Sequence, residues 1–296
     1  MSRLIRNTLA VTAAALVFCV QGRALSSRTF VSTTGNDSNV ALNCSATSNC
    51  RTLNTALSVT SPGGEVVVLD TGGYGPAEIV QAVTVTAIGV DASISVSTAV
   101  PALFIPSGEN VTLIGLSLHG EGIGTNGITF QGGVTLRLYN MLIENFTLNG
   151  VRDVVNGAVE IYDSEINDNG SYGLVVANGT AYVSGTSFEH NKAAAVGIYG
   201  PGEGLITVAD SDFAYNTIGA IAYVGTLTLS NDRFFSNNLA LTATGGALNF
   251  ANCLLDANTT AYSVSSGSIA GTNPGTSFIV PGQAMYGTLS TAVTLQ

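Results

Sequence analysis

The pattern of hydrophobic and polar positions repeats along the chain. Residues 159–169, 206–216, 227–237 and 248–258 place their apolar side chains and their Asn or Asp residues at the same relative positions. Within each segment apolar and polar residues alternate, as in Leu227-Thr228-Leu229, which is the two-residue period of a strand with one buried face. A second alternation follows each terminal asparagine after a small residue. The pattern predicts about three short strands per repeat and leaves no room for a helix.

The spacing of these repeats predicts a coil in which equivalent residues stack. Successive asparagines at 169, 191, 216, 237 and 258 lie 22, 25, 21 and 21 residues apart. Stacking one repeat on the next at about 4.8 Å puts like side chains above one another. The expected interior column is Leu118, Ile143, Ile166, Phe188, Phe213, Phe234 and Leu255.

Two polar columns are expected at the corners of the coil. One contains Asn140, Asp163, Gly185, Asp210, Asn231 and Asn252, and the other runs from Asn169 to Asn258. Asn, Asp and Gly tolerate left-handed backbone geometry, and stacked amides can form hydrogen bonds from turn to turn. We therefore interpret both columns as structural.

These repeats resemble the right-handed parallel β-helix repeats of the pectin lyase-like superfamily, especially its uncharacterised secreted bacterial members. The resemblance covers about residues 65–267. It implies an all-β fold, a right-handed parallel β-helix or β-solenoid of about eight to ten turns. It does not specify an activity, because this fold hosts lyases, hydrolases, adhesins and proteins without known chemistry. A leucine-rich repeat is the main rival, but Val-, Ile-, Thr- and Gly-rich turns without a helical segment argue against it.

The ends of the chain differ from the repeats. Residues 1–24 carry Arg3 and Arg6 before an apolar run and small residues, which is the layout of a secretory signal peptide. Residues 25–64 predict a strand and a short amphipathic helix that caps the coil. The β-helix is expected over 65–270, and residues 271–296 are expected to form a C-terminal cap or tail. No membrane span is expected, because the only long apolar run is too short.

The cysteines fit an exported protein. Cys44 and Cys50 are close in sequence and predict a local disulfide in an oxidising compartment. Cys253 has no obvious partner, and we expect it to pack between turns of the coil. Cys19 lies in the signal, where bulky Phe18 argues against a lipid anchor.

The composition of the chain limits the classes of molecule that it is expected to bind. The formal net charge is −10, and removal of a signal peptide containing three arginines would make it more negative. Nucleic acid and acidic membranes would be repelled, so neither is an expected partner. The protein has no tryptophan but ten tyrosines, which leaves tyrosine as the main aromatic for contacts with sugars.

The resemblance also directs attention to one outer face. Lyases of this fold use Ca²⁺ held by carboxylates with a nearby Arg or Lys, and its hydrolases use clustered Asp residues. On the strand after the glycine the outward positions are expected to be Arg152, Val175, Gly197, Ala222, Thr242 and Ser263. That column lacks a carboxylate cluster, and Asp153 beside Arg152 is interpreted as its surface ion-pair partner.

A second face carries more charge. Outward residues beside the apolar column are Glu144, Glu165, Asp168, Glu189, His190, Asp212 and Arg233. The candidate site residues are therefore Glu165, Glu189, His190, Asp212 and Arg233. The carboxylates could bind Ca²⁺ or act as an acid and base pair, with His190 carrying a proton. The alternative is a solvated acidic stripe without chemistry.

Three functional classes remain open from the sequence. The first is a secreted, non-catalytic binding or surface protein that contacts polysaccharide. The second is a polysaccharide lyase or glycoside hydrolase, and the third is a structural component of the cell envelope. No cofactor is expected, with Ca²⁺ entering only if the protein is a lyase.

Overall fold

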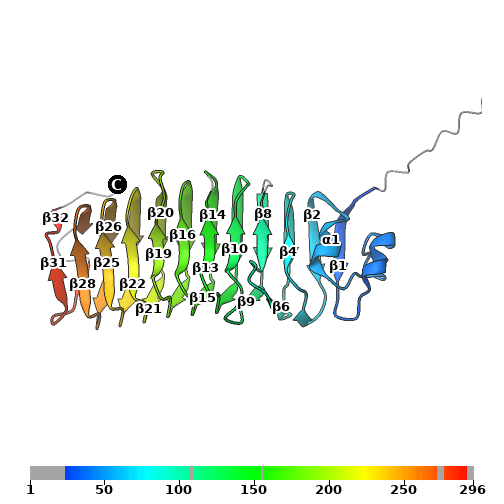
Figure 1. Ribbon diagram of the computed structural model, residues 1–296, viewed down its shortest axis with the longest axis horizontal. Helices are drawn as coiled ribbons and strands as arrows, with labels where there is room; N and C mark the ends of the chain where they lie inside the picture. Colours follow the sequence, from blue (N-terminus) through cyan, green and yellow to red (C-terminus); the bar gives the residue numbers. More distant parts are fainter. Residues whose placement is uncertain (1–23, 107–109, 155, 272–276, 292–296) are drawn as a thin grey trace, which may run out of the picture.

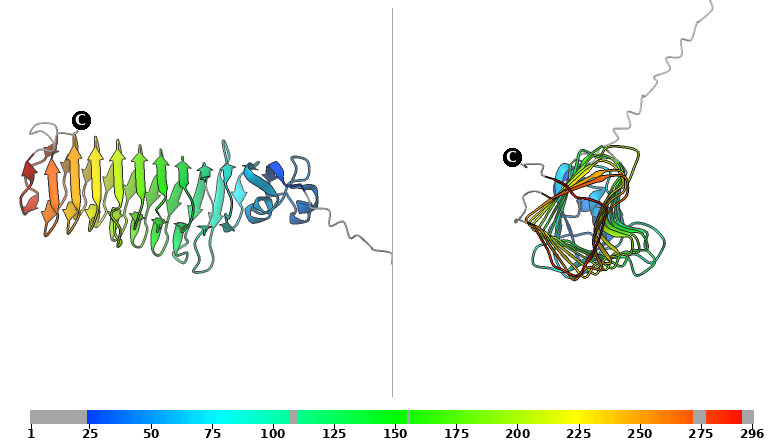
Figure 2. Two further views of the ribbon diagram at one scale, coloured as in Figure 1. Left: turned by 90° about the horizontal axis from the view of Figure 1, so that it is seen from above. Right: turned by 90° about the vertical axis from the view of Figure 1, so that its left-hand side faces the viewer.

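The computed structural model describes residues 24–106, 110–154, 156–271 and 277–291. Over these ranges the chain coils into a stack of turns with three parallel sheets (Figure 1). Seen along its length the stack has a triangular outline (Figure 2). The leucine-rich-repeat alternative is therefore wrong. The proposed signal peptide falls almost wholly outside the described residues.

Each sheet takes one strand from each turn. Sheet 1 has 12 strands, in the order β1 (Ser26–Val31), β2 (Thr60–Val68), β5 (Val83–Thr86), β8 (Asn110–Ile114), β11 (Thr135–Tyr139), β14 (Ala158–Tyr162), β17 (Thr180–Ser184), β20 (Leu205–Ala209), β23 (Thr226–Ser230), β26 (Ala247–Ala251), β29 (Ser268–Gly271) and β32 (Ser290–Thr291). Sheet 2 has 10 strands, β3 (Gly72–Gly73), β6 (Ala92–Ser95), β9 (Leu116–His119), β12 (Leu142–Glu144), β15 (Glu165–Asn167), β18 (Ser187–Glu189), β21 (Asp212–Ala214), β24 (Arg233–Phe235), β27 (Leu254–Asp256) and β30 (Phe278–Ile279). Sheet 3 also has 10, β4 (Ala77–Glu78), β7 (Leu103–Ile105), β10 (Asn126–Phe130), β13 (Asn149–Asp153), β16 (Tyr172–Val176), β19 (Ala194–Ile198), β22 (Ile218–Ala222), β25 (Leu239–Ala243), β28 (Thr260–Val264) and β31 (Ala284–Tyr286). Two ten-stranded sheets agree with the predicted eight to ten turns.

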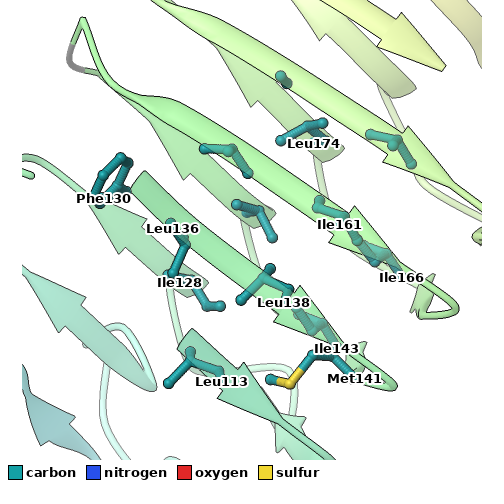
Figure 3. Close-up of a cluster of buried hydrophobic side chains, with 14 of the residues drawn as sticks. Leu113, Ile128, Phe130, Leu136, Leu138, Met141, Ile143, Ile161, Ile166 and Leu174 are labelled. Carbon is teal, nitrogen blue, oxygen red and sulfur yellow. The ribbon is translucent and has the colours of Figure 1, made fainter. Parts of the chain in front are cut away.

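The interior column is the predicted one. The seven residues from Leu118 to Leu255 pair in register through sheet 2, and all are fully buried. Within it the ring of Phe213 stacks on Phe188 at 5.3 Å and on Phe234 at 4.4 Å between centroids. Leucine and isoleucine side chains from the other sheets complete the core, which Figure 3 shows for the central turns. Apolar burial along the whole axis therefore holds the turns together.

Small residues at the start of the sheet 3 strands make room for this core. A Cβ on Gly219 would lie 2.6 Å from Cδ1 of Phe234. The small residue that follows each predicted asparagine is thus required by the aromatic side chains behind it.

The corner between sheets 1 and 2 has the predicted left-handed residues. Asn140, Asp163, Gly185, Asp210, Asn231 and Asn252 all have positive φ between 48° and 62°. These side chains tolerate that conformation better than larger ones.

The corner between sheets 2 and 3 corrects the sequence interpretation. The left-handed residue is the one before each asparagine, at Asp168, His190, Tyr215, Ser236 and Ala257. The asparagines themselves point inward and form a buried ladder, in which Nδ2 of Asn216 donates to Oδ1 of Asn237 at 3.1 Å and to the carbonyl oxygen of Phe188 at 2.9 Å. The left-handed conformation and the hydrogen bonds from turn to turn, both expected of the asparagines, therefore belong to two adjacent residues.

The first and last described segments of the chain join the stack. At the N-terminal end the 3-10 helix η1 (Asp37–Leu42) precedes α1 (Leu53–Leu57), which buries Leu53, Ala56 and Leu57 against β1 and β2. Cys44 and Cys50 form the predicted disulfide in this region. At the other end β30, β31 and β32 add a further strand to each sheet. Gln283 accepts from Asn258 at 2.9 Å and so continues the amide ladder where the sequence shows no repeat.

Candidate functional site on the outer face of sheet 2

Sheet 2 brings three of the five predicted residues together. Its outer face has two columns, because each three-residue strand points its middle side chain inward. Asp212 pairs in register with Ser187 and Arg233, whereas Glu189 lies in the other column beside Ala214. Glu189, Asp212 and Arg233 line one open hollow of about 390 Å³. The remaining lining residues are Phe213, Ala214, Phe234, Phe235, Leu254 and Asp256.

The structure separates Glu165 and His190 from that hollow. Glu165 is exposed and pairs with Ser187, which places it two turns away from Asp212 in the same column. His190 occupies the left-handed corner position with φ 56°, and its ring stacks on Tyr215 at 5.1 Å. The sequence pattern placed these side chains on one outer face but did not resolve which of them share one depression.

The charges in the hollow are partly paired. The guanidinium of Arg233 donates from Nε and from one terminal nitrogen to the two carboxylate oxygens of Asp212, both at 2.6 Å. Hydrogen bonding to Asp212 raises the pKa of Arg233 above its usual value. The pair is exposed, at 67% for Arg233 and 45% for Asp212, so water weakens it. Its main effect is to orient the two side chains.

Glu189 is positioned by neighbours on its own and the preceding turn. The hydroxyl of Ser187 donates to Oε1 of Glu189 at 3.2 Å, and the backbone nitrogen of Glu189 donates to Oδ1 of Asn167 at 3.0 Å. Apolar side chains line the same hollow, since Phe235 and Leu254 are exposed two and three turns beyond Glu189. The hollow thus combines acidic groups with an aromatic surface.

A second outer surface was missed by the sequence interpretation. On sheet 1, Arg137 pairs with Glu160 at 3.0 Å, and the hydroxyl of Tyr162 donates to the same carboxylate at 3.3 Å. Tyr139 stacks on Tyr162 at 4.9 Å with an angle of 8° between the rings, and Tyr182 lies 5.8 Å beyond. The signal was available, since these residues are the polar positions of the alternating strands.

The charged and hydroxyl groups on the sheet 1 surface form hydrogen bonds with one another. Burial and the charge of Glu160 raise the pKa of Tyr162, and the hydrogen bond to Glu160 raises that of Arg137. A guanidinium bound to a carboxylate is a poor base, and rings stacked on each other present mainly their edges outward. Sheet 2 has a similar Arg233–Asp212 pair, but its hollow adds the carboxylate of Glu189 and is therefore the better candidate for chemistry.

The structure corrects two of the positions expected on the outer face of sheet 3, the sheet whose strands follow the glycine. Gly197 pairs with Ile221, not with Ala222, which is buried in the core. Asp153 is also fully buried, because it lies in register with Phe130 and Val176 on the inward side of β13. It is therefore not on the surface beside Arg152, which points to the opposite side of the strand.

The structure offers few other chemical groups. Cys253 is buried, and burial raises its thiol pKa to about 12, so it is not a nucleophile. Within the described ranges, no three or more His, Cys, Asp and Glu side chains are grouped so that they could hold a metal ion. Among the same residues, no helix has the length and apolar character needed to cross a membrane.

Comparison with known proteins agrees with this architecture. A family model described as right-handed beta helix region matches residues 149–278. The structure is similar to that of an alginate lyase from Paenibacillus sp. str. FPU-7, with a TM-score of 0.59 and 13% identity over 90% of this chain and 100% of the lyase. It is also similar to pectate lyase Pel9A, with a TM-score of 0.50 and 13% identity over 92% of this chain and 78% of the other.

At this level of identity, structural similarity establishes the fold but not the activity. A search of curated proteins found no match to the sequence. The stacked turns, the family model and the two solved structures together show that the chain folds as a right-handed parallel β-helix.

Proposed function

We propose that this protein is a secreted, polysaccharide-active β-helix that binds a glycan chain in the hollow on sheet 2. The two similar structures are both polysaccharide lyases, which favours a carbohydrate-active protein over a purely structural one. The Cys44–Cys50 disulfide is compatible with export to an oxidising compartment. The signal-like sequence of residues 1–24 supports the same location.

The observation that carries the proposal is the placement of Glu189 and Asp212 in one hollow. They lie on adjacent turns and two positions apart along the strand. A turn spacing of about 4.8 Å and a rise of about 3.3 Å per residue put their backbones about 8 Å apart. Side chains that project in parallel from one face of a sheet keep about the separation of their backbones, and carboxyl groups about 6.5–9.5 Å apart are typical of glycosidases that invert the anomeric centre. The pair therefore suits attack by water on a glycosidic bond.

The roles of the two carboxyl groups follow from their surroundings. Arg233 holds Asp212 in place as a carboxylate, which suits a base that takes a proton from water. Glu189 forms no ion pair among the described residues, so its carboxyl group takes up more readily the proton that an acid gives to the leaving oxygen. Phe235 offers an apolar surface for a sugar ring.

Elimination is less compatible with these residues than hydrolysis. A lyase needs a neutral base, whereas bonding to Asp212 raises the pKa of Arg233. The hollow also contains Glu189, Asp212 and Asp256 against a single arginine, and the whole chain has a formal net charge of −10. A neutral polysaccharide therefore fits this surface better than a polyuronate.

Product analysis tests the proposal. The protein is incubated with neutral and acidic polysaccharides, with and without Ca²⁺, and reducing ends are measured beside the absorbance of unsaturated uronates. We expect reducing ends from a neutral glycan without unsaturated products. Glu189→Gln and Asp212→Asn should each lower the rate at least about 100-fold, because each removes a proton-transfer group.

Glu165→Gln is the matched control, since it changes an exposed glutamate of sheet 2 outside the hollow. Its rate should stay within about twofold of the wild type. Unsaturated products would show that the reaction is an elimination. Equal rates for all three variants would show that the reaction takes place on another face.

Non-catalytic glycan binding is the second candidate function. The openness of the hollow and the exposure of the Arg233–Asp212 pair favour it, because hydrolysis is helped by excluding water from charged groups. Retention of the protein on a neutral glycan without any product, and loss of retention in a Phe235→Ala variant, would support this function.

A further inference from the structure

The outer face of sheet 1 is a long surface with little charge. In its five-residue strands, from β8 to β26, most outward side chains are Thr, Ser, Ala or Tyr. The described strands of sheet 1 contain four charged residues, Arg28, Glu65, Arg137 and Glu160, so the charges of the face cancel. The chain as a whole has a formal net charge of −10. The excess negative charge therefore lies on other surfaces, and this face does not itself repel an acidic protein.

Aromatic and apolar side chains are exposed in the middle of this face. Tyr182 is 39% exposed and Leu205 is 44% exposed. Both line a hollow of about 380 Å³, together with Glu160, Tyr162 and Thr207 among others. Tyrosine and arginine are enriched where proteins contact each other, and lysine, aspartate and glutamate are depleted there. The composition of the face is therefore typical of a protein–protein contact.

The two central charges of the face are arranged so that they complement those of a second copy of this chain. Arg137 and Glu160 are in register on adjacent strands β11 and β14, as are Tyr139 and Tyr162. A twofold axis parallel to the strands, between β11 and β14, places Arg137 of each copy opposite Glu160 of the other. A twofold axis along the coil would instead place each residue opposite itself, with two guanidinium groups together. The charges therefore favour two coils that run in opposite directions.

The overlap of the two faces in that arrangement is close to what a stable dimer needs. Ten strands of sheet 1, from β1 to β26, face the same ten strands of the second copy. Their spacing of about 4.8 Å gives a length of about 43 Å, and five residues of about 3.3 Å give a width of about 16 Å. The overlap is thus about 700 Å² per copy, whereas specific interfaces commonly bury about 800 Å² per partner.

We propose that sheet 1 is the contact surface of a homodimer in which two coils pack face to face in opposite directions. Arg137 donates to Glu160 of its own chain from Nε and one terminal nitrogen, which leaves further N–H donors for Glu160 of the second copy. The exposed Tyr182 and Leu205 are buried against strands β8 and β5 of that copy. Sheet 2 forms another side of the triangular outline (Figure 2), so its hollow stays open in the dimer.

Sedimentation equilibrium over about 1–100 µM protein tests the proposal, in about 0.15 M NaCl to screen Asp163 and Asp210 at the rim of the face. We expect the wild type to pass from the mass of one chain to twice that mass. Tyr182→Glu should raise the dissociation constant at least about tenfold, because it puts an unpaired charge into the contact.

Tyr215→Glu is the matched control variant. It makes the same change at a tyrosine that is 52% exposed at the corner between sheets 2 and 3, away from sheet 1. Its dissociation constant should stay within about twofold of the wild type. Circular dichroism of each variant checks that the coil is folded.

Two further variants test the charge pairing between the copies. Arg137→Glu and Glu160→Arg each place like charges opposite one another in a homodimer, so each should dimerise at least about tenfold more weakly than the wild type. An equimolar mixture restores opposite charges at both contacts and should recover the mass of a dimer. Mixing cannot repair the pair within either chain, so recovery reports a contact between chains.

Three results would each overturn the proposal. They are a wild type that stays monomeric at about 100 µM, a Tyr182→Glu variant that dimerises like the wild type, and a mixture of the charge variants that does not recover. None of these measurements depends on catalysis or on a glycan, so the outcome is independent of the function proposed for sheet 2.

Discussion

At the residue scale, the most informative side chain is that of Asp232, whose burial costs free energy. Asp232 is fully buried at the corner between sheets 1 and 2, where other turns have Ser164, Thr186, Ser211 and Cys253. Its carboxylate accepts from the backbone nitrogens of Ser211 and Ser230, both at 2.9 Å. Burial nevertheless raises its pKa to about 7, and the nearby charges of Asp210 and Asp212 add to the effect. The folded protein therefore binds a proton there that the unfolded chain releases near pH 4.

This residue predicts a pH dependence of stability. Between about pH 4 and pH 7 the folded state holds more protons at Asp232, so its contribution to stability falls as the pH rises through that window. Asp232→Ser copies Ser211, whose hydroxyl donates to its own strand at 2.8 Å. From pH 4.5 to pH 7.5 the variant should gain on the order of 2–4 kcal/mol relative to the wild type in urea unfolding. Parallel curves for the two proteins would contradict the raised pKa.

At the element scale, the amide ladder ties sheet 2 to sheet 3 on successive turns. Oδ1 of Asn216 accepts from the backbone nitrogen of Asn191 at 2.9 Å and from its Nδ2 at 3.1 Å. Asn216→Ala removes this acceptor together with the donor to the carbonyl oxygen of Phe188. Several buried groups then lose their partners, so we expect a loss of about 2–5 kcal/mol in the free energy of unfolding.

Asn238→Ala provides the comparison, since Asn238 is exposed and directly follows Asn237, the next step of the ladder. It should change stability by no more than about 0.5 kcal/mol. Urea unfolding of both variants measures the difference. Similar losses for the two asparagines would mean that the ladder contributes little.

The elements also show why the strands could be predicted and one register could not. Alternation between Leu, Ile or Val and Thr marks the two faces of sheet 1 clearly. In β22, by contrast, the sequence Ile218-Gly-Ala-Ile-Ala222 has small or apolar residues on both faces, so it carries no contrast between inside and outside. The misplacement of Ala222 for Ile221 follows from that lack of contrast.

At the scale of the whole molecule, the fold was predictable because every turn has the same arrangement of strands and corners. Each turn repeats one set of corner and core residues, and the column from Leu118 to Leu255 could be listed from the sequence. The site was less predictable, because a hollow depends on side chains from several turns. Glu189, Asp212 and Arg233 share one, whereas Glu165 in the same pattern does not. The tyrosine surface of sheet 1 became evident only from the three-dimensional arrangement.

The three faces of the prism therefore differ in chemistry although they come from one repeat. Sheet 1 carries a self-satisfied tyrosine surface, sheet 2 an acidic hollow with an aromatic wall, and sheet 3 a hollow that ends in Arg152. The ribbon views in Figure 2 show the three sheets as three faces that run along the length of the stack.

The most direct measurement of the central claim is a crystal structure of the Glu189→Gln variant soaked with an oligosaccharide of the neutral glycan. The variant keeps the shape of the hollow while slowing cleavage. We predict sugar density on sheet 2, with one ring against Phe235 and a glycosidic oxygen between residue 189 and Asp212. Density confined to the tyrosines of sheet 1, or to the outer face of sheet 3, would contradict the account.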